Sequence, residues 1–113
     1  MWVLVVEDDS LINLMATDEL KTAGYEVISA FNADEAIEIL ENRGDIRLIF
    51  TDIDMPGSMD GLKLAAAVRH RWPPVQIVVT SGKQSPSELP QGTVFIPKPY
   101  TSAKITETVA RLI

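Results

Sequence analysis

Five acidic side chains stand at the ends of two apolar segments of this 113-residue chain. Glu7, Asp8 and Asp9 follow the run at 2–6, and Asp52 and Asp54 follow the run at 47–51. Carboxylates that converge in a poorly solvated crevice repel one another and resist ionising together. A hard divalent cation removes that conflict, so the pattern predicts an oxygen-ligand metal site, with Mg²⁺ as the expected ion and Mn²⁺ as the alternative. Because Mg²⁺ usually shares its site with a phosphoryl group, the pattern also indicates phosphate chemistry.

A hydroxyl and an ammonium follow two later apolar segments. Thr80-Ser81 closes the run at 75–80, and Lys98-Pro99 follows the run at 93–96. These groups are the donors that a phosphoryl group needs where its oxygens are not on the metal. We therefore expect them at the same edge of the fold as the acids.

The order of the segments predicts how these residues are brought together. Apolar runs alternate five times with amphipathic stretches, which is typical of an α/β fold with a doubly wound parallel sheet. The strands are expected near 2–6, 26–30, 47–51, 75–80 and 93–96. In the flavodoxin-like (βα)5 arrangement, with strand order 2-1-3-4-5, ligands bind between the ends of strands one and three. Those are the two strands that end in the acids.

Helix boundaries can also be predicted. N-cap acceptors are expected at Ser10, Asn32, Asp60 and Thr101, and the first two helices are expected to stop at Gly24 and Gly44. The sequence Trp72-Pro73-Pro74 should end the third helix. Between Gly82 and Gly92, two prolines interrupt a short polar stretch, so the fourth helix is expected to be shortened to a single turn or irregular.

Composition narrows the class of protein. The length suits a single domain over residues 1–113, without an output domain. A net charge of −6 and the lack of a basic stripe speak against direct nucleic-acid binding. There is no cysteine for disulfides or thiolate zinc sites, and no apolar run of membrane length. We expect a cytoplasmic protein.

Four sequence blocks carry a resemblance to a known family. VLVVEDDSLI, TDIDMPGSMDGL, the TS that follows IVV, and FIPKPYT resemble the receiver domain of two-component response regulators, in order and over essentially the whole chain. The resemblance implies that Asp52 is the phosphoacceptor. It also implies metal binding by Asp8 directly, by Glu7 through water, by Asp54 through its backbone carbonyl, and by the Asp52 carboxylate.

The same resemblance assigns the remaining roles. Lys98 would contact a phosphate oxygen, with the Lys98-Pro99 bond cis, and Thr80 would donate its hydroxyl to the phosphoryl group. Phe95 would then repack inward as the partner of Thr80 in a switch, the alternative being a core ring that stays buried. Asp9 and His70 receive no chemical role and are expected to be solvated charges at helix ends.

The resemblance implies a signalling domain rather than an enzyme with turnover. A sensor histidine kinase or histidine phosphotransfer protein would donate the phosphoryl group from phosphohistidine, and the domain would later dephosphorylate itself. Phosphorylation would switch a surface for a downstream protein or for homodimerisation. Two alternatives remain at this point. One is an interaction module that keeps the fold without phosphorylation, and the other, suggested by the spacing of Asp52 and Asp54, is a phosphatase of the haloacid-dehalogenase type.

Overall fold

The computed structural model of the protein describes residues 1–55, 57, 59–82 and 89–113. Within this part of the chain, strands and helices alternate from the N-terminus, and only β4 is followed by a strand without an intervening described helix. The elements are β1 (Trp2–Val6), α1 (Ser10–Thr22), β2 (Glu26–Ala30), α2 (Ala33–Asn42), β3 (Ile46–Asp52), α3 (Gly61–Arg71), β4 (Gln76–Ser81), β5 (Val94–Pro97) and α4 (Ser102–Leu112).

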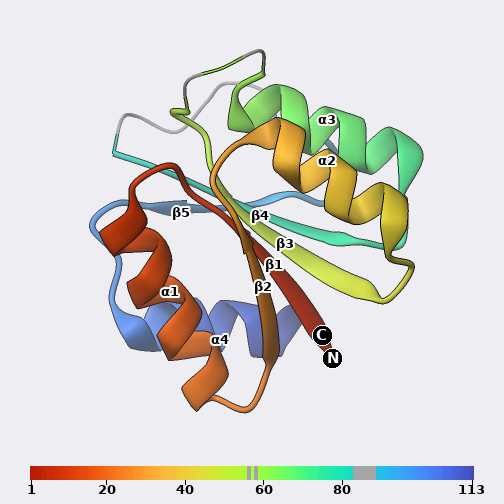
Figure 1. Cartoon of the computed structure of the whole chain (residues 1–113). Coiled ribbons are helices and arrows are strands. Elements are labelled where there is room, and N and C mark those ends of the chain that lie inside the picture. The colour runs from red at the N-terminus through yellow and green to blue at the C-terminus, as the bar shows by residue number, and fades with distance from the viewer. Residues whose placement is uncertain (56, 58, 83–88) are drawn as a thin grey trace.

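The five strands form one sheet in the order β2-β1-β3-β4-β5, and every neighbouring pair is parallel. Helices α1 and α4 cover one face of the sheet, and α2 and α3 cover the other (Figure 1). The predicted fold class and strand order are therefore confirmed, and the predicted strand limits agree with the structure to within one residue. Because all strands are parallel, their carboxyl ends meet at one edge.

The three inner strands, β1, β3 and β4, are buried on both faces, which explains their continuous apolar character. In β1, Val3 and Val5 pack under α1 and α4, whereas Leu4 and Val6 pack under α2 and α3. All four side chains are fully buried. Two cores therefore hold β1 from both sides, and the end of β1 is a rigid position for the residues that follow.

The helix boundaries agree with the sequence at all but one N-cap. Asn32, Asp60 and Thr101 each accept a backbone N–H of the first turn, as predicted. The prediction of Ser10 was wrong, because the N-cap of α1 is Asp9, whose carboxylate accepts the N–H groups of Leu11 and Ile12. Aspartate and serine are comparable caps, so adjacent candidates cannot be separated by residue type alone.

The predicted shortening of a helix between β4 and β5 falls mainly on residues 83–88, which lie outside the described residues. The flanking residues, Gly82 and 89–93, belong to no helix. Arg69 at the end of α3 ties this connection to the body of the domain, since its guanidinium donates to the carbonyls of Gln91 and Pro73 at 2.8 and 2.9 Å.

Both tryptophans lie beneath arginines at the amino ends of the strands. The Arg43 guanidinium lies 4.1 Å from the ring centroid of Trp2, and that of Arg71 lies 4.4 Å from the ring of Trp72. Trp72 also lines a small hollow together with Ile46, the first residue of β3. This edge of the sheet is opposite to the one that carries Asp52.

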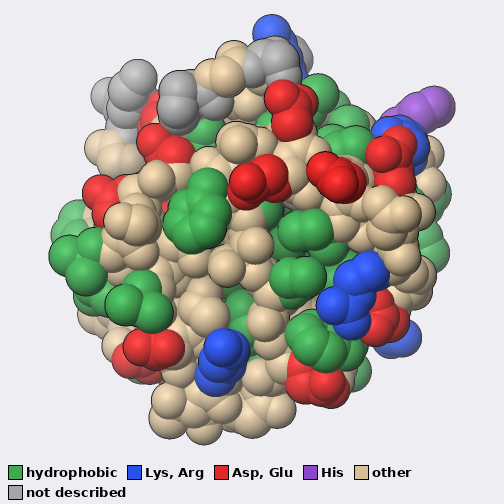
Figure 2. Space-filling model, in the orientation of Figure 1, with side chains coloured by type: hydrophobic (Ala, Val, Ile, Leu, Met, Phe, Trp, Pro, Cys, Tyr) green, Lys and Arg blue, Asp and Glu red, His purple; other side chains and the backbone are tan. Residues whose placement is uncertain are grey.

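The surface is mixed in charge. On the face seen in Figure 2, Lys and Arg side chains are scattered among Asp and Glu and form no continuous basic patch. None of the described helices combines the length and the apolar character that crossing a bilayer would require.

Candidate functional site

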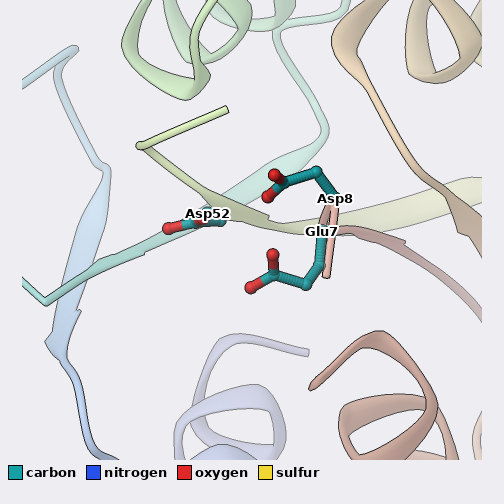
Figure 3. Close-up of side chains that lie close together, drawn as sticks. All are labelled: Glu7, Asp8 and Asp52. Carbon is teal, nitrogen blue, oxygen red and sulfur yellow. The ribbon is translucent and has the colours of Figure 1, made fainter. Parts of the chain in front are cut away.

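Three carboxylates meet at the carboxyl ends of β1 and β3, which are neighbours in the sheet (Figure 3). One oxygen from each of Glu7, Asp8 and Asp52 lies within 4.8 Å of the others. Glu7 and Asp52 are each only 4% exposed, whereas Asp8 is open to solvent. The sequence placed these residues at strand ends, and the parallel sheet brings their side chains together.

Asn13 holds the loop that carries Glu7 and Asp8. Its side-chain amide donates to the carbonyl oxygens of Glu7, at 3.1 Å, and Ala30, at 3.0 Å, and so joins the ends of β1 and β2. Thr17 donates to Asn13 Oδ1 at 3.3 Å from the next turn of α1. This role of Asn13 could not be predicted from the sequence, because a single asparagine in an amphipathic helix is not distinguishable from a residue on the solvent face.

Asp9 also positions the acid cluster. Besides capping α1, it donates its backbone N–H to Glu7 Oε2 at 3.0 Å. The prediction of a solvated charge at a helix start is confirmed for Asp9, which is exposed at the N-cap of α1, and its hydrogen bonds add a positioning role. Its carboxylate fixes the start of the helix, and its amide holds the Glu7 side chain toward the site.

Lys98 brings the positive charge to the cluster. Its Nζ lies 3.0 Å from Glu7 Oε1 and 3.3 Å from Asp52 Oδ1. The backbone N–H of Lys98 donates to the Ser81 carbonyl at 2.8 Å, which extends the pairing of β4 and β5 by one residue. The Lys98-Pro99 peptide bond is cis, which confirms that expectation from the resemblance.

Thr80 lies beside Asp52, because the two residues are paired in the register of β3 and β4. The Thr80 hydroxyl oxygen is buried and has no hydrogen-bond partner among the described residues. Asp52 Oδ1 is likewise buried without a hydrogen bond in that part of the chain, and its contact with Lys98 has the length of an ion pair. Buried polar atoms are nearly always hydrogen-bonded, so two such atoms side by side indicate a place for a polar ligand.

Asp54 stands apart from the group formed by Glu7, Asp8 and Asp52. Its side chain is exposed and does not belong to the carboxylate cluster, and Oδ2 accepts the Ser81 hydroxyl at 2.6 Å. This hydrogen bond joins the loop after β3 to the end of β4. The backbone carbonyl through which Asp54 is expected to bind metal is unaffected by the direction of its side chain.

Gly61 lets α3 begin against the end of β3. A Cβ at this position would collide with the Asp52 carbonyl oxygen and would lie 2.7 Å from Ile53 Cα. The Gly61 N–H donates to the Ile53 carbonyl at 2.9 Å. The block TDIDMPGSMDGL therefore contains a glycine that is required by close backbone approach, which sequence analysis did not identify.

The electrostatics of the cluster favour neutralisation. Burial raises the pKa of the Asp52 carboxyl, and Lys98 only partly opposes this. Burial also raises the pKa of Glu7, against the hydrogen bonds from Asp9 and Lys98, while Asp8 and Asp52 add to the increase. For Lys98, burial opposes the charge, but the hydrogen bond to Glu7 and the charge of Asp52 outweigh it and raise the pKa. Among the described residues, the single ammonium of Lys98 does not balance the charge of the three carboxylates.

The residues fit a divalent cation. Three carboxylate oxygens are close enough to share one ion, two of them are in a poorly solvated position, and oxygen ligands are those that Mg²⁺ prefers. The exposed Asp8 leaves one side open, where water and a phosphoryl oxygen could complete an octahedral shell.

Two further sequence predictions concern Phe95 and His70. Phe95 on β5 is half-buried and packs against the core under α2 and α3, so it is neither a fully buried ring nor a free one. Its role in a switch remains a prediction. His70 is exposed in the last turn of α3 between two arginines, which confirms that it lies at a solvated helix end.

Known proteins resemble this chain over its whole length. A family model described as the response regulator receiver domain matches residues 3–110. The sensor kinase CckA of Brucella abortus is 29% identical over 98% of this chain, and the transcriptional regulatory protein PrrA of Mycobacterium tuberculosis is 32% identical over 98%. The crystal structure of the response regulator protein TrrA of Thermotoga maritima, in complex with Mg²⁺ and BeF, superposes with a TM-score of 0.90. That chain is 28% identical, and the match covers 99% of this chain and 98% of TrrA.

The chain matches only part of its curated relatives. It spans 12% of the length of CckA and 49% of that of PrrA. These relatives include both a kinase and a regulator.

Proposed function

This chain belongs to the response regulator receiver domain family, and from that premise we propose that it accepts a phosphoryl group on Asp52 from a phosphohistidine donor. The receiver domain is a signalling domain of two-component systems. The observation that carries the proposal is the pair of buried oxygens Asp52 Oδ1 and Thr80 Oγ1, which have no hydrogen-bond partner among the described residues, beside the three-carboxylate cluster.

In the proposed transfer, an Asp52 carboxylate oxygen attacks the phosphorus. The bond between phosphorus and the donor's imidazole nitrogen breaks, and its electron pair returns to the ring. Thr80 donates its hydroxyl to one phosphoryl oxygen, and the Lys98 ammonium pairs with another. The distance of 3.3 Å between Lys98 Nζ and Asp52 Oδ1 supports this assignment, because the ammonium needs only a small shift to follow the new charge.

Glu7, Asp8 and Asp52 would hold Mg²⁺, with Asp54 adding its backbone carbonyl. When bound, the ion neutralises charge on the transferring group and on the acids. Glu7 remains anchored by the Asp9 amide and by Lys98, so its carboxylate is already oriented before the ion arrives. Catalysis in this proposal is therefore mainly positioning and electrostatics.

The added charge would act on the rest of the domain through Thr80 and Phe95. A phosphoryl group that binds the Thr80 hydroxyl would draw this end of β4 toward Asp52, and the half-buried Phe95 on the neighbouring strand could then pack further inward. Such a two-state surface would bind a downstream protein or a second copy of the domain. The donor would be a sensor histidine kinase or a histidine phosphotransfer protein, and the site of action would be the cytoplasm.

The direct test is the intact mass of the protein after incubation with acetyl phosphate, with and without Mg²⁺. We expect a gain of one phosphoryl group that requires the metal and is absent in Asp52→Asn. Asp9→Asn is the matched control, since it removes a neighbouring charge but keeps a good N-cap acceptor, and it should still be labelled. Undiminished labelling of Asp52→Asn would contradict the assignment of the acceptor. Catalytic release of phosphate from small phosphate esters would point instead to a phosphatase.

A further inference from the structure

A small hollow lies at the amino ends of the strands, on the edge of the sheet opposite to Asp52, and has a volume of about 280 Å³. Leu40, near the end of α2, lines one side, and Trp72 and Val75, which follow α3, line the other. Ile46 at the start of β3 lies between them. Because Leu40, Ile46 and Val75 are buried, the inner surface of this amino-end hollow is apolar.

Two arginines hold the walls of the amino-end hollow in place. Helices α2 and α3 lie side by side (Figure 1), and Arg71 of α3 donates to the carboxylate of Glu41 in α2 at 2.7 Å. Arg69 donates to the carbonyls of Pro73 and Val75 at 2.9 and 3.3 Å, which fixes the connection from α3 to β4. The hollow is therefore preformed, and an occupant would not have to order its walls.

An irregularity of β3 places another arginine at the rim. Trp2 of β1 pairs with Ile46, but the next residue of β1 pairs with Leu48, so Arg47 is an extra residue of β3, as in a β-bulge. Ile46 packs into the core under α2 and α3, whereas Leu48 packs into the core under α1 and α4. Arg47 belongs to neither core, and its exposed side chain lines the amino-end hollow.

Arg47 differs from the neighbouring arginines in its contacts. Four of the five arginines of the chain gather around the hollow, namely Arg43, Arg47, Arg69 and Arg71. Arg43 and Arg71 are engaged in ion pairs, and Arg69 donates to backbone carbonyls. Within the part of the chain that the structure describes, Arg47 has no hydrogen bond or ion pair. A guanidinium in this state can bind a carboxylate through two parallel hydrogen bonds.

We propose that the amino-end hollow binds an acidic segment of a partner protein, with one apolar side chain of the partner in the hollow and a flanking carboxylate on Arg47. Sites for small molecules usually have about 300–1,000 Å³, and the smaller volume here suits a single leucine or phenylalanine side chain. Burial of this anchor would supply the affinity, and the charge on Arg47 would supply specificity. Because the hollow and Asp52 lie at opposite edges of the sheet, this docking is independent of the proposed phosphoryl transfer.

The net charge of −6 does not exclude an acidic partner. Asp52 lies about 20 Å from the hollow along β3, whereas charges are screened over about 8 Å at physiological ionic strength. The partner would therefore interact mainly with the charges around the hollow. Because Glu41 and Asp45 are each paired with an arginine, Arg47 leaves a local excess of positive charge.

The test is an NMR titration of the ¹⁵N-labelled domain with short capped peptides. With the peptide Glu-Asp-Phe-Asp-Glu we expect saturable shifts of the backbone amides of Gly44, Trp72 and Val75, and none at Glu7 or Gly82 on the opposite edge. The same peptide with alanine in place of phenylalanine should bind at least about 10-fold more weakly, because it leaves the hollow unfilled. Gln-Asn-Phe-Asn-Gln, which keeps the shape without the charge, should also bind more weakly than the acidic peptide.

Variants of the domain test the role of Arg47. Arg47→Glu should weaken binding of the acidic peptide by about 5-fold or more and should keep a dispersed spectrum, since this side chain is exposed. Arg111→Glu is the matched control, because it makes the same change in net charge on α4, which covers the other face of the sheet. Its affinity should stay within about 2-fold of the parent. Asp52→Asn should bind the peptide like the parent, so a failure of phosphorylation would leave this result unaffected.

Four results would each overturn the proposal. The first is the absence of saturable shifts around the hollow with the acidic peptide. Equal binding of the alanine and phenylalanine peptides would show that the hollow does not hold the anchor. Unchanged affinity in Arg47→Glu would remove the role of its charge. Binding of free hydrocinnamate as tight as that of the peptide would identify a pocket for small carboxylates in place of a docking site for a protein.

Discussion

Glu7 and Asp52 are carboxyl groups that the fold keeps in a position unfavourable for their own charge. Burial raises the pKa of both above the usual values. A carboxyl with a raised pKa in the folded protein favours folding when it is protonated. Its contribution is therefore fully present below the pKa of the unfolded chain and is lost as the pH rises through the folded pKa. At neutral pH, where both carboxyls are ionised, Glu7 and Asp52 therefore contribute least to the stability of the metal-free domain.

In the absence of metal, removing the charge of one of these buried carboxylates should stabilise the folded domain. We expect Asp52→Asn, measured by urea unfolding in EDTA at neutral pH, to gain about 1 kcal/mol, a typical magnitude for a single substitution. The advantage should shrink as the pH falls through the acid range, because the parent carboxyl then becomes protonated. Asp45→Asn is the contrasting control, since the hydrogen bond from Arg43 lowers the pKa of Asp45, and its loss should not stabilise. A parent as stable as Asp52→Asn at neutral pH would contradict this account.

At the scale of elements, one buried amide connects α1 to the ends of two strands. Asn13→Ala removes both hydrogen bonds to the carbonyls of Glu7 and Ala30 and leaves those buried acceptors without this donor. We expect a loss of about 1–3 kcal/mol in the free energy of unfolding, together with weaker Mg²⁺ binding, because the loop that holds Glu7 is loosened. Chemical denaturation and a metal titration measure the two effects.

Asn42 provides the matched control for Asn13. It is also a helical asparagine whose amide donates to a backbone carbonyl, that of Glu38, but it is exposed at the end of α2. Asn42→Ala should change stability by no more than about 0.5 kcal/mol and leave metal affinity unchanged. Equal effects of the two substitutions would show that the burial of Asn13 does not determine its contribution to stability and metal affinity.

The start of α3 depends on the absence of a side chain at Gly61. Gly61→Ala would push the helix away from the Asp52 carbonyl, because the new Cβ has no room. A cost of about 1–3 kcal/mol is expected from forced displacement in a packed region, along with slower phosphorylation of Asp52. Gly44→Ala, where a Cβ meets nothing within 4 Å and the backbone is not left-handed, should be nearly neutral. Thermal unfolding and labelling by acetyl phosphate compare the two variants.

Features of the fold that depend on neighbouring residues in the sequence could be predicted, whereas features that depend on contacts between distant residues could not. The limits of the strands could be predicted to within a residue, because each strand is a short apolar run and the three inner strands are buried on both faces. The acids at the ends of β1 and β3 could be placed at one site, because parallel strands share an edge. The choice of Asp9 over Ser10 as N-cap depends on loop geometry, and the burial of Asn13 depends on Ala30, which is 17 positions away in the chain. The hydrogen bond between Ser81 and Asp54 joins the end of β4 to the loop after β3, 27 positions away in the chain, and has no local signal in the sequence.

For the molecule as a whole, metal binding should be linked to folding. A ligand that binds the folded state alone stabilises it by RT ln(1 + [L]/Kd), which is about 2.7 kcal/mol at a concentration of 100 Kd. We therefore expect the melting temperature of the parent to rise with Mg²⁺ concentration. Asp8→Asn should abolish most of the rise while changing the metal-free stability little, because Asp8 is exposed. A melting temperature independent of Mg²⁺ in the parent would contradict the metal site.

The two edges of the sheet differ in composition. Both tryptophans lie at the edge formed by the amino ends of the strands, opposite to the edge that carries the acids. Trp2 is paired with Ile46 at the start of β3, and Trp72 lies near the same residue, whereas Asp52 is the last residue of that strand. Six residues of extended chain separate Ile46 from Asp52 by about 20 Å. Indole emission responds to contacts within a few ångströms, and here those contacts are the guanidinium groups of Arg43 and Arg71. We therefore expect the tryptophan fluorescence of this domain to report unfolding and not the chemistry at Asp52.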